Sequence, residues 1–190
     1  METAAIIKHI EWIESAGERG EQISLDDVDM RSFPIDPRIL EQGFFSDCNF
    51  SEISFTGTDF YLSEFYSCDF SNARFTDCDF TKTTLDYCIF SGAVFENCKF
   101  PRADAFQSVF QKCSFRNCSF VGFNLMDCDL QSSAFTSVDF DAAYLDKVKI
   151  EGAVFTDPEN LPLLNHLSII SAENQIIEGK QAVKWINSNK

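Results

Sequence analysis

The sequence predicts an all-β solenoid, and three of its regularities carry that prediction. Between Phe45 and Phe155 every residue whose number is a multiple of five is apolar, and 17 of those 23 positions are Phe. A second column of mostly small residues lies two positions earlier and contains all eight cysteines. The period of five fits neither the 3.6 residues of a helical turn nor the two of a strand. It fits a coil in which each pentapeptide forms one short side.

The repeated segments resemble a known family. Residues 68–72 (Cys-Asp-Phe-Ser-Asn) and 78–82 (Cys-Asp-Phe-Thr-Lys) are similar to the repeat of pentapeptide-repeat proteins, in which a small residue and often Asp or Asn precede Leu or Phe. The resemblance implies a right-handed quadrilateral parallel β-helix with four pentapeptides in each coil. Counting the phase from Leu25 to Phe155 gives 27 repeats, or about six to seven coils.

Three segments are expected along the chain. Residues 1–20 form an N-terminal capping helix, residues 21–157 the β-helix, and residues 158–190 a C-terminal helical cap or tail. The first coil, over residues 21–40, should be irregular because its repeats are degenerate and contain two prolines.

The N-terminal helix is expected over residues 3–16, because Ile6, Ile10 and Ile13 share one face there. The stacked core of a solenoid is exposed at its two ends, so such segments are needed to cover it.

Two helical pieces are expected in the C-terminal tail. The first is a short plug suggested by Leu161, Leu163, Leu164 and Leu167, and the second lies around Gln181 to Asn187. The tail has more apolar surface than a plug requires. The resemblance implies that this surface forms a homodimer.

The core should consist of side chains stacked 20 residues apart, at about 1.5–3 kcal/mol for each buried ring. One position breaks the pattern, because Ala105 would leave a void among larger residues. Phe123, the one large residue of the small-residue column at that corner, is predicted to fill it.

The cysteines are interpreted as reduced core residues, since free Cys behaves as a small buried hydrophobe. Cys48, Cys68 and Cys88 should form one ladder and Cys78, Cys98 and Cys118 another. Disulfides or a zinc site are weaker alternatives, because side chains in a parallel ladder point the same way and Cys-x-x-Cys spacing is absent.

The charge restricts the partners. With 30 acidic and 15 basic residues the formal net charge is −15, which disfavours direct binding to nucleic acid or to an anionic membrane. No run of 18 apolar residues is present, and charged residues interrupt the N-terminal apolar segment as they would not in a signal peptide. A cytoplasmic protein is therefore expected.

Little in the sequence suggests catalysis. The two histidines, His9 and His166, are expected in the terminal helices, away from the repeated Asp and Ser residues. No phosphate-binding loop, nucleophile elbow or metal-ligand spacing occurs. We therefore predict no catalytic, cofactor-binding or metal-binding residues, and no enzyme.

The first candidates for partner binding are acidic residues in the position before the central residue of a repeat: Asp59, Asp69, Asp79, Asp129 and Asp139, with Asp104 in the same position. They have two interpretations. Asp side chains stabilise backbone turns, which a corner every five residues would use. Alternatively, they recognise a partner.

Aromatic and other large apolar residues at outward positions supply the second candidates: Tyr66, Tyr87, Phe106, Met126 and Tyr144, together with Phe44. An exposed stripe of this kind marks an interface. The alternative is that one of the terminal segments folds over it.

The predicted function is a non-enzymatic protein-binding module. The resemblance implies a DNA mimic that binds DNA gyrase or topoisomerase IV, as in quinolone-resistance and toxin-immunity members of the family. The alternative is a scaffold that docks an unrelated protein through the aromatic stripe.

Overall fold

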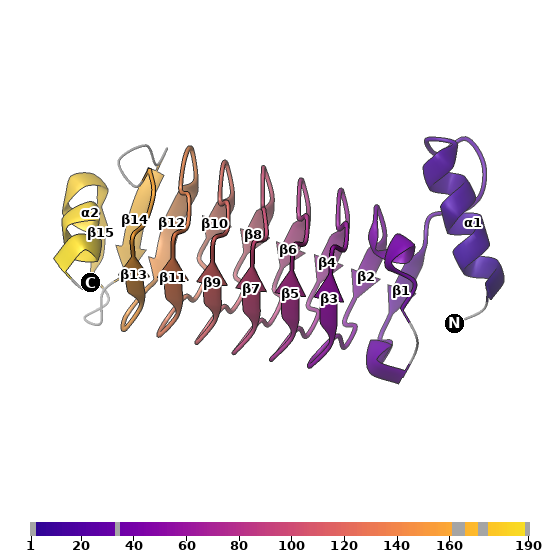
Figure 1. The fold of residues 1–190 in the computed structure, drawn as a ribbon, viewed down its shortest axis with the longest axis horizontal. Helices are drawn as coiled ribbons and strands as arrows, with labels where there is room; N and C mark the ends of the chain where they lie inside the picture. The colour runs from indigo at the N-terminus through magenta and orange to yellow at the C-terminus, as the bar shows by residue number, and fades with distance from the viewer. Residues whose placement is uncertain (1–2, 33–34, 161–165, 171–174, 189–190) are drawn as a thin grey trace.

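The computed structural model describes residues 3–32, 35–160, 166–170 and 175–188. They form a parallel β-solenoid of about seven turns with a helix at each end of the rod, as predicted (Figure 1). The helices are α1 (Thr3–Glu14) and α2 (Gly179–Ser188). Two 3-10 turns, η1 (Met30–Ser32) and η2 (Pro37–Leu40), lie in the irregular first coil.

Two sheets form opposite sides of the rod, and their strands are parallel except for β15, which pairs antiparallel with β14 at the end of sheet A. Sheet A has nine strands in the described part of the chain: β1 (Ser24–Asp26), β2 (Phe44–Ser46), β4 (Glu64–Tyr66), β6 (Thr84–Asp86), β8 (Asp104–Phe106), β10 (Asn124–Met126), β12 (Tyr144–Lys149), β14 (His166–Ile170) and β15 (Ile176–Glu178). Sheet B has six there: β3 (Ser54–Thr56), β5 (Arg74–Thr76), β7 (Val94–Glu96), β9 (Ser114–Arg116), β11 (Ala134–Thr136) and β13 (Val154–Thr156).

The register confirms a coil of 20 residues. Phe45 pairs with Phe65 in sheet A, and Phe55 pairs with Phe75 in sheet B. Single bridges such as Asp69↔Ile89 and Asp79↔Lys99 form the other two sides. The central residue of each repeat points inward and its neighbours point outward, as the alternating side chains of a strand require.

The corners depend on a left-handed backbone. Every fifth residue from Gln42 to Asp157 has a positive φ, between 47° and 74°. The N–H group of each corner residue points along the rod, so that Asp47 donates to Tyr66 O at 2.9 Å and Glu52 to Ser71 O at 2.9 Å. These bonds join successive coils and give the corner N–H groups partners.

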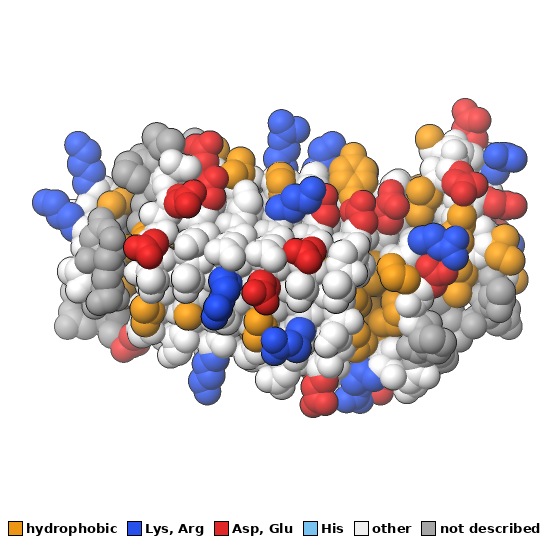
Figure 2. All heavy atoms as spheres, in the orientation of Figure 1, with side chains coloured by type: hydrophobic (Ala, Val, Ile, Leu, Met, Phe, Trp, Pro, Cys, Tyr) orange, Lys and Arg blue, Asp and Glu red, His pale blue; other side chains and the backbone are white. Residues whose placement is uncertain are grey.

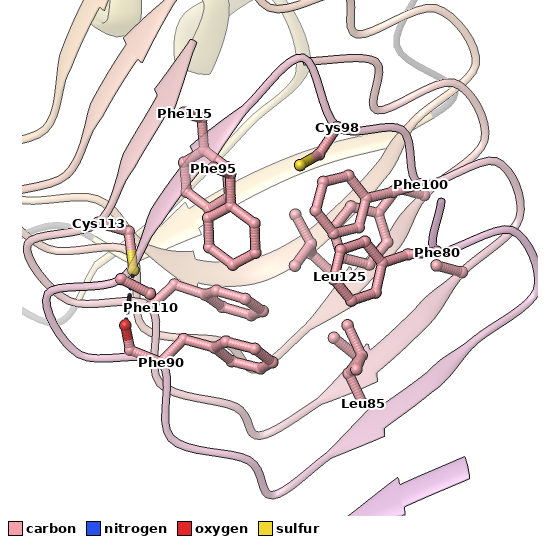
Figure 3. Close-up of a cluster of buried hydrophobic side chains, with 14 of the residues drawn as sticks. Phe80, Leu85, Phe90, Phe95, Cys98, Phe100, Phe110, Cys113, Phe115 and Leu125 are labelled. Carbon is pink, nitrogen blue, oxygen red and sulfur yellow. Dashed lines mark hydrogen bonds between the residues drawn. The ribbon is translucent and has the colours of Figure 1, made fainter. Parts of the chain in front are cut away.

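The core consists of stacked phenyl rings (Figure 3). Phe95 stacks on Phe75 and Phe115 with centroids 4.7 and 4.8 Å apart and ring planes within 7° of parallel. Rings on adjacent sides of one coil meet edge to face, for example Phe95 and Phe100 at 5.7 Å and 64°. Both arrangements are favourable geometries for aromatic pairs.

The small-residue column has a polar role that the sequence did not suggest. The thiol of Cys113 donates to the carbonyl of Phe90 at 3.0 Å (Figure 3), and the hydroxyl of Thr83 donates to that of Phe60 at 2.7 Å. In each case the acceptor lies 23 residues earlier, near the corner of the previous coil. Cys, Ser and Thr therefore combine small volume with a donor for a buried carbonyl.

All eight cysteines are free and buried, as predicted. Burial raises the pKa of Cys113 to about 12 and that of Cys128 to about 12, so both remain thiols at neutral pH. Thiols in this environment are poor nucleophiles and poor metal ligands.

Phe123 is buried, as predicted. Although it belongs to the small-residue column, its ring joins a stack of the central phenylalanines. It stacks on Phe100 at 5.0 Å and 8°, in the place that the period assigns to Phe120. Phe120 is instead turned edge-on to Phe100, at 5.3 Å and 79°. The filling of space left by Ala105 stays a prediction.

At the N-terminal end, α1 packs on η2, and His9 connects the two segments. The His9 side chain is fully buried; its Nδ1 accepts a hydrogen bond from Ile23 N–H at 3.0 Å. Its Nε2 must then be protonated and donates to Glu41 O at 2.9 Å. The imidazole is therefore held neutral between the cap and the first coil.

The C-terminal tail differs from the prediction. Leu167 and His166 were expected in helices but lie in β14, which pairs with β12 and extends sheet A. Residues 161–165, which include the other leucines of the expected plug, lie outside the described residues. The second expected helix is confirmed as α2, which packs on β14 and β15.

Candidate protein-interaction surface

The outer side of sheet A, here called the sheet A face, carries the predicted aromatic residues. It consists of residues 44, 46 and 47 and their equivalents every 20 positions up to 147. These residues flank the buried central residue of each strand or follow at the corner, so their side chains point to solvent.

The aromatic stripe, defined as Phe44, Tyr66, Tyr87, Phe106, Met126 and Tyr144, runs along this face with one member in each coil. Two pairs of its rings touch: Phe44 and Tyr66 have centroids 5.6 Å apart, and Tyr87 and Phe106 meet edge to face at 5.5 Å and 86°. Tyr87 is 48% exposed. The other five members of the stripe are half-buried, so the stripe is a partly exposed row with two ring pairs in it.

The described terminal elements leave the middle of the stripe uncovered. Helix α1 and the pair β15–α2 lie at opposite ends of the rod (Figure 1). Only at the C-terminal end does a described tail residue meet the stripe, where His166 stacks on Tyr144 at 4.6 Å. In the described residues no terminal element covers Tyr87 or Phe106, and an interface role for the stripe stays a prediction.

Acidic side chains share this face with the rings. It bears Asp47, Glu64, Asp86, Asp104, Asp127 and Asp146 against one base, Lys147. The corresponding residues of the sheet B face, 54 to 157, include three acids and two bases. The negative charge of the chain is therefore concentrated on the side that is also aromatic.

The strand ladder is interrupted at the centre of the sheet A face. Strands β6 and β8 pair only at Thr84↔Asp104, whereas other neighbouring pairs such as β4 and β6 match at three residues. The Phe106 N–H group donates instead to the Asp86 carboxylate at 2.9 Å. Partial burial raises the pKa of Asp86, and the nearby carboxylate of Asp104 raises it further, against the lowering effect of that hydrogen bond.

The predicted acidic candidates lie on the two sides between the sheets. Asp69 and Asp129 are on one of them and Asp59, Asp79 and Asp139 on the other. Each carboxylate accepts the N–H group two residues later, for example Tyr61 N–H to Asp59 at 2.8 Å and Ser71 N–H to Asp69 at 2.8 Å. These are the turn-stabilising bonds of the first interpretation.

The charge of the column that contains Asp59, Asp79 and Asp139 is also partly neutralised. Lys99 Nζ lies 2.8 Å from Asp79 Oδ2, and the pKa of Asp79 is lowered by this ion pair and by Thr81 despite partial burial. The face turned to the viewer in Figure 2 shows a similar mixture, with blue and red side chains scattered among uncharged ones. The structure thus places the predicted aromatic residues on one face, whereas the predicted acids are divided between the two other sides, with Asp59 and Asp79 bridged in successive coils.

Asp104 was noted in the sequence as sharing the position of the candidate acids, but the other acids of the sheet A face were missed because they occupy different places in the repeat. Asp104 precedes the central residue, Asp86 follows it, and Asp127 is at a corner. Grouping all outward residues 20 apart, rather than one position of the pentapeptide, would have shown the excess of acids.

One histidine lies closer to polar residues than expected. His166 Nε2 is 3.2 Å from Asp146 Oδ1, and the Ser168 hydroxyl donates to the same oxygen at 2.8 Å. Since the serine bonds the carboxylate rather than the imidazole, His166 is not placed to take its proton. The described residues contain no group of three or more potential metal ligands. Among them, no helix is long and apolar enough to cross a bilayer.

Comparisons with known proteins agree with the observed repeat. The family described as pentapeptide repeats matches in eight copies, over residues 45–81 and 88–125. A search of curated proteins gave no match. Among solved structures, QnrB1, a plasmid-mediated fluoroquinolone resistance protein, is 17% identical, with 76% of this chain and 77% of that chain covered and a TM-score of 0.42.

HetL, a pentapeptide-repeat protein involved in heterocyst differentiation regulation from Nostoc sp. strain PCC 7120, is 16% identical over 93% of this chain and 100% of its own, with a TM-score of 0.38. The eight matched copies continue in the same register on both sides of the matched segments. Residues 45–81 and 88–125 therefore match the pentapeptide-repeat family.

Proposed function

We propose that this chain is a non-enzymatic protein-interaction module that acts through its sheet A face. The observation that carries the proposal is the coincidence of a partly exposed aromatic stripe and six carboxylates on one side of the rod. Aromatic residues are enriched at the centres of protein interfaces, and charge complementarity steers the partner and fixes its orientation.

The partner we propose is DNA gyrase or topoisomerase IV, with the rod acting as a DNA mimic in antibiotic resistance or toxin immunity. A net charge of −15 and at least one carboxylate in each coil of the sheet A face support an imitation of a phosphate backbone. The coils repeat at about 4.8 Å, the spacing of neighbouring strands. The repeats' resemblance to the gyrase-binding members of the family supports it as well.

The test is DNA supercoiling by purified gyrase with and without the protein, and with and without a quinolone. A DNA mimic should inhibit supercoiling or protect it from the drug, and the effect should fall steeply as salt rises, because charge pairs at exposed surfaces are screened. Absence of any effect at about micromolar protein, an ordinary affinity for a specific complex, would reject gyrase as the partner.

A second candidate is a scaffold that docks an unrelated protein mainly through the rings. The exposure of Tyr87, 48%, beside the half-buried Phe106 favours it. Binding through apolar area depends weakly on salt, so affinity measured between low and high salt separates this candidate from the DNA mimic.

We also propose that the chain works in the cytoplasm and pairs through its C-terminal tail. Eight free cysteines suit a reducing compartment. Strand β15 is the last described strand of sheet A, and its Ile176 is 53% exposed. Light scattering should give the mass of a dimer, and Ile176→Lys should convert it to a monomer.

A further inference from the structure

We infer that the sheet A face docks a basic segment of a partner protein, whose lysine or arginine side chains lie on Tyr87 and Phe106 and reach the carboxylates of Asp86 and Asp104. The inference rests on the proposal that the chain binds proteins, but it does not require the partner to be gyrase. It names the centre of the surface and the chemistry of the side chains that it takes.

The first support is the geometry of the central ring pair. Tyr87 and Phe106 come from successive coils and meet edge to face at 5.5 Å. Tyr87 is a corner residue with φ 58°, which directs its ring outward next to the ladder interruption between β6 and β8. Its exposed face is available to a cation, which binds aromatic rings within about 6 Å of the centroid.

The second support is the uncompensated charge beside those rings. Asp86 bonds the Phe106 N–H group, and Asp104 Oδ1 accepts the Asn124 amide at 2.7 Å. Within the described residues, neither carboxylate has a lysine, arginine or histidine within ion-pair distance. The one base of the face, Lys147, lies near the C-terminal end and 3.8 Å from Asp146.

These features select a basic protein segment over other occupants. An excess of carboxylates repels phosphates of nucleic acid and anionic lipid. A purely apolar partner would bury Asp86 and Asp104 without a counter-charge, which is costly. Lysine and arginine avoid both penalties, because their stems pack on rings while their charged ends meet carboxylates.

Two variants separate the rings from the charges. Tyr87→Leu keeps an apolar side chain but removes the π face. Asp86→Asn with Asp104→Asn removes two charges and keeps the oxygen that accepts from Phe106 N–H and from the Asn124 amide. The matched control is Asp59→Asn with Asp139→Asn on another side, where the oxygens that accept from Tyr61 and Asp141 N–H are likewise kept.

The probe is a fluorescein-labelled decapeptide of alternating arginine and serine, and binding to the full chain is followed by anisotropy at low salt, about 50 mM. We expect Tyr87→Leu to weaken binding about fivefold, the size of a cation–π contact near a surface. The Asp86/Asp104 double variant should weaken it about tenfold and flatten its salt dependence. The control double variant should change affinity by less than about twofold.

Two outcomes would overturn the inference. One is no measurable binding of the peptide by the wild-type chain. The other is an equal loss in the two double variants with no loss in Tyr87→Leu, which would show attraction to net charge alone. The peptide measurement contains no gyrase, so a negative result in the supercoiling assay does not affect it. If the chain modulates gyrase, Tyr87→Leu modulates it equally well, and the peptide does not bind, then only the present inference is rejected.

Discussion

At the scale of single residues, the corners are where the fold is most demanding. A left-handed backbone costs an ordinary residue about 1–2 kcal/mol, and Gly or Asn much less. Corner residues here include Leu62, Lys82 and Arg102, all with φ between 55° and 57°. The fold accepts this cost because the N–H groups of the corner residues from Gln42 to Ser137 bond the next coil.

Leu62→Asn should therefore stabilise the chain. Leu62 is 40% exposed, so little packing is lost, and Asn adopts the left-handed region more readily. We expect the free energy of unfolding, measured with urea, to rise by about 0.5–1 kcal/mol. The control, Thr76→Asn in β5, is at an extended position and should give no gain; an equal gain at both sites would contradict the explanation.

A second prediction concerns Phe123, whose ring stacks on Phe100 in the place expected for Phe120. Replacing Phe95 by Ala removes a ring stacked on both sides and should cost about 3–5 kcal/mol. Phe123→Ala should cost less, about 2 kcal/mol, because Phe120 can turn back onto Phe100 and fill part of the space. Urea denaturation of both variants tests the order, and equal losses would show that Phe120 does not move.

At the scale of elements, the N-terminal cap depends on a neutral imidazole. Burial lowers the pKa of His9, and the bond to the Glu41 carbonyl and the Glu41 charge oppose this only in part. Above the usual pKa of about 6.5 the cap contact is fully present. As the pH falls through that value, His9 is protonated more readily in the unfolded cap than in the folded one, so the cap loses stability.

We expect α1 to loosen as the pH falls below about 6.5. Trp12 stacks near His9, with ring centroids 6.1 Å apart, and its fluorescence should report the change in a Trp185→Phe background. His9→Phe should make the cap weaker at all pH values and remove the pH dependence. A pH response that persists in His9→Phe would assign it to another group.

The elements also show what the sequence could and could not predict. The five-residue phase predicted the sides of each coil, because every inward position has the same chemistry. The tail has no such period, and Leu167 was assigned to a helix although β14 is determined by its pairing with β12. Tertiary pairing of this kind is not visible in local spacing.

The same limit applies to the surface. The aromatic stripe could be predicted because outward positions follow from the phase. Asp59 and Asp69 were prominent because they recur in one place of the repeat, and that recurrence serves turn formation. Asp86, and its closeness to Asp104, became recognisable only when successive coils were placed side by side.

At the scale of the whole molecule, a net charge of −15 makes the folded rod repel itself. Two like charges 4 Å apart in water cost about 1 kcal/mol before screening, and the screening length falls from about 10 Å at 0.1 M salt to about 3 Å at 1 M. Added sodium chloride should therefore raise the urea midpoint of the wild-type chain.

The sheet A face should account for a measurable share of that effect. The pKa of Asp86 is raised in the folded chain, so its ionised carboxylate lowers the free energy of unfolding at neutral pH. That free energy should rise again as the pH falls towards the raised pKa and the carboxylate takes up a proton. Asp86→Asn with Asp104→Asn should thus stabilise the chain at low salt, by about 0.5–1 kcal/mol, and the part of the gain that comes from repulsion between the two carboxylates should fall at high salt. A loss of stability at low salt would show that these carboxylates support the fold. A gain would show that they are kept at a cost to stability, as expected of residues that serve binding.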